Sequence, residues 1–288
     1  MQCKPIYEFL AWDNCNNNCE FCFQRELPRL FAHKKRKEIL DEILLFLNSD
    51  KFIKGSHVLL VGGEIFDKPI DFKIIENFYT CIINKMLQNE IDLLYINTNL
   101  IYKNIAGLFA VLLKLRDNNL MNRVRFTTSY DIQGRFKTDD DRQLMLNNLK
   151  YIKKHFPSCQ IVTNMILTKP LCKHLIDQKL KPAEFMREYD CWINFIPYII
   201  YKEELSATKE EVFKSLIKIE EACPGYIEKY ITNLDLNQDK LLYIYKNNTF
   251  EFGSCENASC GHSVNFNKYS QSKTCFVCDL KEVFNVYK

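Results

Sequence analysis

Apolar residues recur along the first two-thirds of the chain in two alternating patterns, short apolar runs and longer stretches of helical spacing. The short runs predict six β-strands. They lie at Ile6–Ala11, His57–Val61, Asp92–Ile96, Val124–Ser129, Gln160–Leu167 and Cys191–Tyr198. The stretches of helical spacing predict a helix after each of the first five strands. These helices lie at Leu30–Leu47, Phe72–Leu87, Ala106–Leu115, Asp140–His155 and around Lys173–Tyr189.

Strands that alternate with helices pair in parallel through right-handed crossovers, so the predicted fold class is α/β. Six strands are fewer than the eight of a closed barrel. They suit either a partial barrel or an open doubly wound sheet, and we expect the partial (βα)6 TIM-like barrel. In both architectures the chemistry lies where the carboxyl ends of the strands release their loops.

The pattern changes after a further predicted helix at Thr208–Ala222. Residues Lys240–Gly253 alternate apolar and polar side chains around Asn247-Asn248, which predicts a β-hairpin. Four cysteines follow the hairpin closely. We therefore divide the chain into a core of residues 1–225 and a small Cys-rich C-terminal domain of residues 226–288.

The composition narrows the class of protein. The 288 residues are 47% hydrophobic, which is enough for a sizeable core. The formal net charge is +3 with both signs mixed along the chain, which does not favour a nucleic-acid partner. The N-terminal residues lack a basic start followed by an apolar segment, and no apolar run approaches the ~20 residues that span a bilayer. We expect a cytoplasmic protein with no membrane partner.

Thirteen cysteines are many for a cytoplasmic chain, in which disulfides rarely persist. Three lie within residues 15–22 and four within residues 255–278. In a reducing compartment such close spacing indicates metal or cluster ligation. The other six are scattered singly, and we expect small apolar core residues at these positions. They are Cys3, Cys81, Cys159, Cys172, Cys191 and Cys223.

The first group has the spacing Cys15-x-x-x-Cys19-x-x-Cys22 and follows the first predicted strand directly. Thiolates are soft ligands for zinc or for iron–sulfur clusters. A structural zinc site is normally closed by four protein ligands, whereas these are three. A four-iron cluster on three cysteines keeps one iron open for another molecule. A zinc knuckle that uses a distant fourth ligand is the alternative.

This spacing, with Phe21 before the third cysteine, resembles the signature of the radical S-adenosylmethionine superfamily. The resemblance implies a [4Fe–4S] cluster on the three cysteines, whose open iron chelates S-adenosylmethionine. It also implies reductive cleavage of that cofactor to a 5′-deoxyadenosyl radical, which abstracts hydrogen from a substrate. In this family the aromatic at the position of Phe21 packs against the adenine.

Further motifs match the family in chain order. Gly62-Gly63-Glu64 follows the second predicted strand and resembles the family's Gly-Gly-Glu motif, which implies that it receives the cofactor's ammonium group. Absent side chains at the glycines let a ligand approach the backbone. The third strand ends in a polar group that includes Asn97, as in many family members. A tight turn between strand and helix is the ordinary alternative for the Gly-Gly-Glu motif.

The fourth and fifth predicted strands carry the remaining matches. The resemblance implies that Ser129 contacts the cofactor and that an arginine beyond it pairs with the cofactor's carboxylate. Arg142 is our match for that arginine, and Arg135 is its rival. Asn164 resembles the family's polar ribose contact. Each of these residues could instead serve the local structure alone.

The second group, Cys255, Cys260, Cys275 and Cys278, supplies four thiolates, which predicts a closed metal site. A hairpin followed by cysteines resembles the auxiliary-cluster domains of SPASM and twitch type, which implies a second [4Fe–4S] cluster. The spacing is shorter than is usual in that group. A zinc ribbon therefore remains the alternative, and either metal would stabilise a domain with little core of its own.

From these features we expect a radical S-adenosylmethionine enzyme that acts on a peptide, a nucleotide or another small metabolite. Such an enzyme needs an electron donor, for example a flavodoxin or ferredoxin. The competing hypotheses are a zinc- or cluster-containing RNA-binding protein and an electron-transfer protein without this chemistry. Tyr130, Asn194 and Tyr198 lie at or near predicted strand ends, where they line a cavity or pack in the core. We assign no hydrogen-donating residue.

Overall fold

The structure is a computed structural model, and it describes most of the predicted core. The described residues are 6–12, 14–22, 35–197, 203–205, 207–224, 243–246, 249–252 and 264–265. All four cysteines of the C-terminal group lie outside them. So do Tyr198 and the first residues of the helix expected from Leu30.

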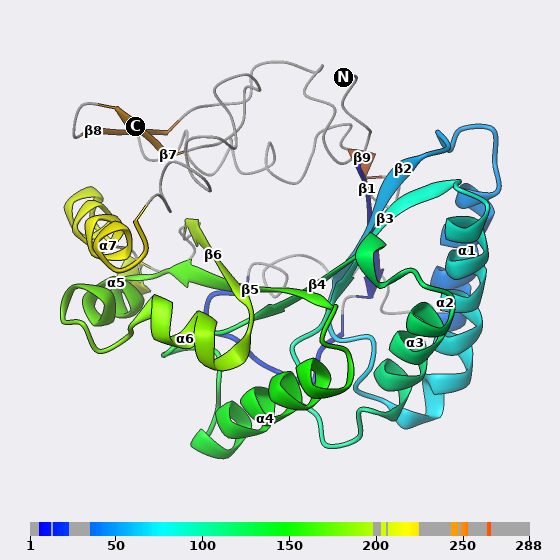
Figure 1. Ribbon diagram of the computed structural model, residues 1–288, viewed down its shortest axis with the longest axis horizontal. Helices are drawn as coiled ribbons and strands as arrows, with labels where there is room; N and C mark the ends of the chain where they lie inside the picture. The colour runs from blue at the N-terminus through cyan, green and yellow to red at the C-terminus, as the bar shows by residue number, and fades with distance from the viewer. Residues whose placement is uncertain are drawn as a thin grey trace.

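A parallel sheet of seven strands forms the centre of the fold (Figure 1). Its order is β6-β5-β4-β3-β2-β1-β9, and every neighbouring pair is parallel. The first six strands therefore lie side by side in chain order without a reversal. A doubly wound sheet requires such a reversal, so that alternative is wrong. The strands are β1 Ile6–Trp12, β2 Ser56–Gly62, β3 Ile91–Asn97, β4 Val124–Ser129, β5 Gln160–Leu167, β6 Trp192–Pro197 and β9 Val264–Asn265.

Seven α-helices are described, and the first four lie along one face of the curved sheet (Figure 1). Their ends carry ordinary helix signals. Thr138 caps α4 by accepting a hydrogen bond from the Asp141 N–H, and acidic residues fill the first turn, where they complement the helix dipole. The helices are α1 Arg36–Leu47, α2 Phe72–Leu87, α3 Ala106–Asp117, α4 Asp139–His155, α5 Lys169–Ile176, α6 Pro182–Tyr189 and α7 Lys209–Ala222.

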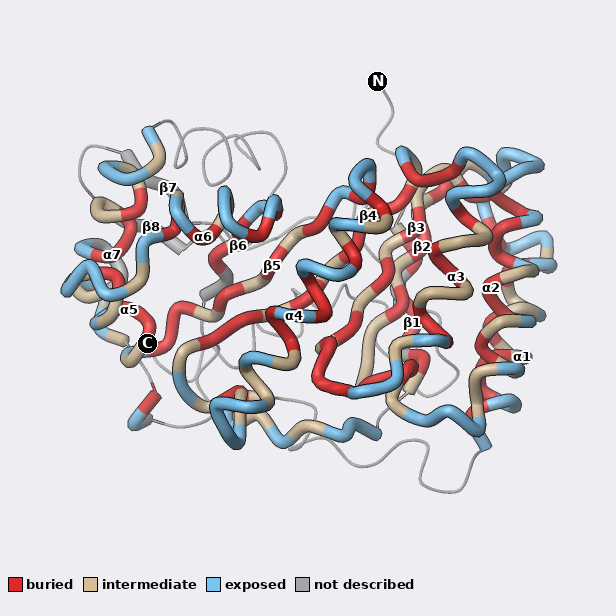
Figure 2. Tube along the Cα trace, turned by 60° about the horizontal axis from the view of Figure 1, so that its bottom comes forward, coloured by how far each residue is buried: buried red, intermediate tan, exposed pale blue. Residues whose placement is uncertain are grey.

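Every strand of the core buries alternate side chains against the helices. Tyr7 and Phe9 of β1 lie 5.6 and 5.7 Å, ring centre to ring centre, from Phe46 of α1, which fixes the face that they occupy. The same alternation runs through most of β2, β4 and β5 and through β3 from Leu94 onward, and stretches of buried and intermediate colour follow one another along these strands in Figure 2. The intervening side chains point to the opposite, concave face and are only partly covered.

Three features differ from the sequence prediction. The helical stretch expected around Lys173–Tyr189 is two helices, because α5 ends at Ile176 and Pro182 begins α6 at a position that suits proline. Cys81 is exposed on α2 rather than buried, whereas Cys159, Cys172 and Cys191 are core residues as expected. The third feature is β9, which was not predicted.

The described part of the C-terminal region consists of a hairpin and one short strand. The predicted hairpin is present as the antiparallel pair β7 Tyr243–Lys246 and β8 Thr249–Phe252. Two residues further along the chain, Val264 and Asn265, pair with Tyr7 and Glu8 of β1. They cover the edge of β1, which would otherwise expose unpaired backbone groups.

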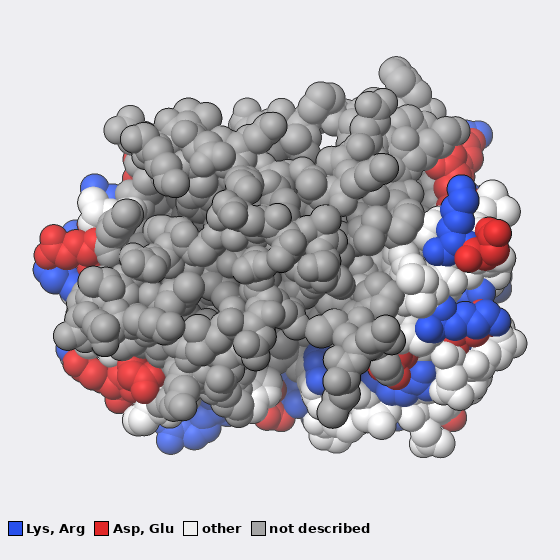
Figure 3. Space-filling model, turned by 90° about the horizontal axis from the view of Figure 1, so that it is seen from above, with Lys and Arg blue, Asp and Glu red and all other residues white. Residues whose placement is uncertain are grey.

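No helix in the described ranges is both long and apolar enough to cross a membrane. On the described rim of the face seen in Figure 3, basic and acidic side chains lie side by side.

Replacing Leu94 by alanine tests the assignment of the buried face. Leu94 is fully buried, whereas Leu45 on α1 is 71% exposed. We expect Leu94→Ala to lower the free energy of unfolding by about 2–5 kcal/mol and Leu45→Ala to change it by less than about 0.5 kcal/mol. Urea denaturation measures both values. Equal effects of the two substitutions would contradict the assignment.

Candidate functional site

The three N-terminal cysteines occupy the loop that leaves the carboxyl end of β1. Asn17 lies between the first two sulfur atoms. Its backbone N–H donates to Cys15 Sγ at 3.4 Å, and its side-chain amide donates to Cys19 Sγ at 3.3 Å. The Cys22 N–H donates to the Cys19 carbonyl at 3.2 Å, which turns the chain tightly between these two ligands. N–H groups directed at sulfur stabilise negative charge there, as a bound thiolate requires.

The protein does not by itself activate the thiols of Cys15 and Cys19. Although Cys15 is exposed, desolvation raises the pKa of its thiol to about 11, and desolvation also raises the pKa of Cys19. Both groups are therefore protonated at neutral pH unless a bound metal displaces the proton. In the described part of the chain, no three His, Cys, Asp or Glu side chains converge as they would around one metal ion.

The chemistry of this donor set fits a cluster better than a single zinc ion. A tetrahedral zinc ion holds sulfur ligands at about 2.3 Å, which brings them within about 4 Å of one another. A four-iron cluster places each cysteine on a different iron, so its three sulfurs stand further apart. Three soft ligands that share one loop and do not converge on a single point within the described residues suit the second requirement.

Gly62 and Gly63 let the end of β2 meet the beginning of the cysteine loop. Gly62 has a φ of +130°, and a Cβ there would lie 2.0 Å from the Trp12 carbonyl oxygen. A Cβ on Gly63 would lie 1.7 Å from the Asn14 carbonyl oxygen. The Gly63 N–H donates to the Trp12 carbonyl. The absent side chains thus serve a contact between two backbone segments, and the proposed contact with a cofactor stays a prediction.

Glu64 lies beneath this junction, where its carboxylate is buried. One carboxylate oxygen accepts from the Phe66 N–H at 2.9 Å. The other accepts from the Thr98 hydroxyl at 2.8 Å and from the Asn99 N–H at 2.6 Å. Burial raises the pKa of Glu64 to about 7, against these hydrogen bonds. The carboxylate therefore holds the loop after β3, and its acceptor sites are largely filled by the protein.

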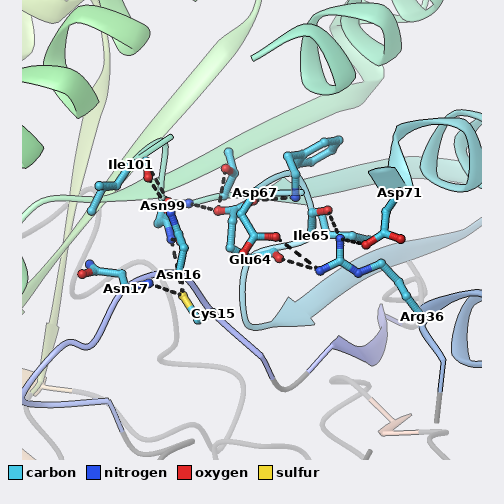
Figure 4. A network of polar contacts seen from close by, with 12 residues as sticks. Cys15, Asn16, Asn17, Arg36, Glu64, Ile65, Asp67, Asp71, Asn99 and Ile101 are labelled. Atoms are coloured by element: carbon cyan, nitrogen blue, oxygen red, sulfur yellow. Dashed lines mark hydrogen bonds and ion pairs between the residues drawn. The ribbon is translucent and has the colours of Figure 1, made fainter. Parts of the chain in front are cut away.

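Asn99 connects the loop that Glu64 holds to the first cysteine (Figure 4). Its side-chain amide donates to Cys15 Sγ at 3.4 Å and to Asn16 Oδ1 at 2.7 Å. The Asn16 amide in turn donates to the Ile101 carbonyl at 2.5 Å. A chain of hydrogen bonds thus links the buried Glu64 to the Cys15 sulfur through the loop after β3.

Arg36, the first residue of α1, braces the other side of the Glu64 turn (Figure 4). Its guanidinium group donates to the Ile65 carbonyl at 2.7 Å and to the Glu64 carbonyl at 3.2 Å. It forms ion pairs with Asp67 at 3.3 Å and Asp71 at 3.0 Å. The sequence reading missed Arg36, because it lies in a basic run that looks like a solvated surface.

A second buried cation supports the other end of the cysteine loop. Arg135 lies 5.4 Å from the centre of the buried Phe21 ring and forms an ion pair with Asp131 at 2.9 Å. Asp131 also accepts from the Ile166 N–H at 2.8 Å. Burial raises the pKa of Asp131 to about 6, although Arg135 opposes the shift. The Arg135 carbonyl accepts from the Asn17 amide at 2.9 Å, which ties this pair to the loop.

The two rival arginines have different surroundings. Arg135 is buried and committed to Asp131 and Phe21. The Arg142 side chain is 39% exposed and pairs with Asp139 at 3.0 Å. Arg142 therefore has guanidinium surface left for a ligand.

The remaining predicted residues lie on the concave face near the carboxyl ends of the strands. Ser129, Asn164 and Asn194 are register partners on β4, β5 and β6, and the Asn194 amide donates to Asn164 Oδ1 at 3.0 Å. Asn97 ends β3, where its amide donates to the Leu60 carbonyl at 2.9 Å. The structure thus brings these four residues to one polar face of the sheet.

A scan against protein-family models found no matching family, and a search of curated proteins found no relative.

The raised pKa of Glu64 predicts a pH dependence of stability in metal-free protein. The unfolded carboxyl ionises near pH 4.5, and the folded one near pH 7. Between these values the native state keeps a proton that the unfolded chain has lost. The free energy of unfolding therefore falls as the pH rises through this window, by on the order of 3 kcal/mol, and levels off above it.

Urea denaturation of the wild type and Glu64→Gln from pH 4 to 8 measures this contribution. We expect the free energy of unfolding of the variant to fall less steeply with rising pH, because the contribution of Glu64 is removed. Glu188→Gln is the control, because Glu188 is exposed and its pKa is lowered by Lys150. If the free energies of unfolding of the wild type and Glu64→Gln differ by the same amount at every pH, the prediction is contradicted.

Proposed function

We propose that this chain is a radical S-adenosylmethionine enzyme, with Cys15, Cys19 and Cys22 as ligands of a [4Fe–4S] cluster. The observation that carries the proposal is the cysteine loop itself. It offers three soft ligands with N–H donors at two of the sulfur atoms, at the carboxyl end of the first strand of a parallel sheet. Chemistry in such sheets is located at this edge.

The topology supports a partial (βα)6 barrel as the scaffold. The six core strands follow chain order, and helices α1 to α4 lie on one face of the curved sheet (Figure 1). In a barrel of this type the concave face lies inside. The polar residues at the ends of β3 to β6 would then face the same interior as the cysteine loop.

When bound, the cluster supplies the electron that cleaves S-adenosylmethionine to a 5′-deoxyadenosyl radical. Asn17 and Asn99 direct N–H groups at the ligand sulfurs, and such hydrogen bonds raise the reduction potential of a cluster. The Gly62-Gly63 backbone and the buried Glu64 hold the loop in place. Ser129, Asn164 and Arg142 would orient the cofactor, the last by its exposed guanidinium group.

The C-terminal cysteines, the external electron donor and the cytoplasmic location belong to the same proposal. Cys255, Cys260, Cys275 and Cys278 would bind an auxiliary [4Fe–4S] cluster or a zinc ion. The short strand β9 lies between the second and third of these cysteines and pairs with β1, the strand that leads into the first cluster loop. This pairing supports a C-terminal region that lies against the core and takes part in the same function.

Metal content and cofactor cleavage test the proposal. We expect protein purified without oxygen to bind about four irons at the first site and to form 5′-deoxyadenosine when reduced with S-adenosylmethionine. The triple variant Cys15→Ala/Cys19→Ala/Cys22→Ala should lose these irons and all cleavage. Cys81→Ala is the matched control, because Cys81 is exposed on α2. Zinc in place of iron, with no cleavage, would overturn the proposal.

The same preparation identifies the C-terminal metal. A total of about eight irons, falling to about four in Cys255→Ala/Cys260→Ala, would indicate an auxiliary cluster. One zinc ion lost in that variant would indicate a zinc ribbon and leave the first site intact.

Binding and stability measurements should distinguish the roles of Arg142 and Arg135. We expect Arg142→Met to weaken S-adenosylmethionine binding by about tenfold to a hundredfold with unchanged iron content, since it removes one charge-assisted contact. Arg135→Met should instead lower the free energy of unfolding by roughly 3–5 kcal/mol, because it leaves Asp131 buried without its partner. Calorimetric titration and urea denaturation measure these effects. Unchanged affinity in Arg142→Met would remove Arg142 from the cofactor site.

A further inference from the structure

Four polar side chains form a compact array on the concave face, below the ends of the strands. Tyr95 and Asn97 belong to β3, and Arg125 and Thr127 belong to β4. Tyr95 is the register partner of Arg125, and Asn97 is the register partner of Thr127. All four alternate with residues buried against the helices, so they share the opposite face.

Part of the hydrogen-bonding capacity of this array is unfilled within the described residues, although the Asn97 amide donates to the Leu60 carbonyl. Arg125 Nη1 and Asn97 Oδ1 are both buried without a hydrogen-bond partner. Arg125 forms no ion pair with any described residue, and the hydroxyls of Tyr95 and Thr127 form no hydrogen bond with one. Desolvation raises the pKa of Tyr95, and the nearby guanidinium group of Arg125 partly offsets this.

The unpaired buried atoms of Arg125 and Asn97 indicate a bound molecule whose hydrogen-bonding groups complement them. Arginine cannot lose its proton in a protein, so burial does not neutralise it. Buried polar groups are normally hydrogen-bonded. The partner must offer an acceptor to the guanidinium group and a donor to Asn97 Oδ1, whereas the two hydroxyls can donate or accept.

The charge and shape of the array favour a carboxylate. A planar guanidinium group matches a carboxylate in a two-point contact. The other described basic side chain on this face, His57, lies 3.6 Å from the Asp92 carboxylate. A single available positive charge suits a singly charged group better than a phosphate with two charges.

We propose that Arg125, Tyr95 and Thr127 bind a carboxylate group of the substrate, and that Asn97 Oδ1 accepts a hydrogen bond from a donor group beside that carboxylate on the same molecule. Thr127 is two residues before Ser129 on the same strand, about 7 Å below the row that we assign to the cofactor. A substrate held at Arg125 would extend from there toward the cysteine loop. That the bound carboxylate belongs to a substrate rests on the proposed function. The array itself is defined by its residues alone.

An internal ion pair is the competing explanation, and register alone points to Glu8 as the residue to test. Through register pairs with Leu59 and Tyr95 it lies in the same row as Arg125, three strands away, or about 14 Å along the sheet. An intramolecular pair with Glu8 would make Arg125 a structural residue.

Thermal unfolding of the full chain in acetate and in chloride, at equal ionic strength, tests the proposal with acetate as the probe. We expect acetate at about ten times its dissociation constant to raise the wild-type Tm by about 2–4 °C. Arg125→Met should abolish the rise and Thr127→Val should reduce it. Arg116→Met, which alters an exposed arginine paired with Asp117, should keep it. In chloride, the Tm of Arg125→Met should equal or exceed that of the wild type.

Three results would overturn the proposal. The first is a wild-type Tm that does not respond to acetate, or a response that survives in Arg125→Met. The second is a larger, Arg125-dependent rise with inorganic phosphate, which would reject the carboxylate class. The third is a lower Tm of Arg125→Met in chloride that is not additive with Glu8→Gln, which would show the internal ion pair.

Binding of S-adenosylmethionine separates this proposal from the proposed function. Arg125→Met should leave its affinity unchanged, and a loss would show that the array binds the cofactor's own carboxylate instead. An Arg125-dependent acetate response in a protein that does not bind S-adenosylmethionine would keep the site and reject the radical chemistry.

Discussion

The candidate site depends on a contact between two backbone segments that only glycine permits. Gly62 and Gly63 place the end of β2 against Trp12 and Asn14, with no room for a Cβ at either position. The first residues of the cysteine loop are thereby fixed by the sheet itself. A site built on strand ends holds its ligands more accurately than one on a free loop. The position of Cys15 follows from this junction.

Buried polar groups complete the support, because the loop has little apolar surface of its own. Its sequence from Asn14 to Cys22 contains one large apolar side chain, Phe21. Such a segment cannot be ordered by hydrophobic burial, so its backbone and amide groups need partners. Glu64 and Arg36 supply them on one side, and the Arg135–Asp131 pair on the other. Glu64, Arg36, Arg135 and Asp131 are each matched by hydrogen bonds or by an opposite charge, as their burial requires.

The sequence predicted most of the elements but only part of what the site residues do. Helix α2 and strands β4 and β5 were predicted to the residue, because each has a clear apolar period. Strand β9 has two residues and hence no period to detect. The glycines and Glu64 were identified from a motif, yet their contacts with Trp12, Asn14 and Asn99 arise from segments distant in sequence. Arg36 and Asp131 gave no signal, since their importance lies in their burial and pairing.

The concave face of the sheet carries several rows of polar residues. Here the row of Ser129, Asn164 and Asn194 is followed by Asn97 and Thr127, and then by Tyr95 and Arg125. The opposite face of the sheet contributes to the apolar core, where Leu94, Ile96 and Phe126 are fully buried. One face of the sheet thus packs the core, and the other presents polar side chains. A ligand can bind the polar face without disturbing the core.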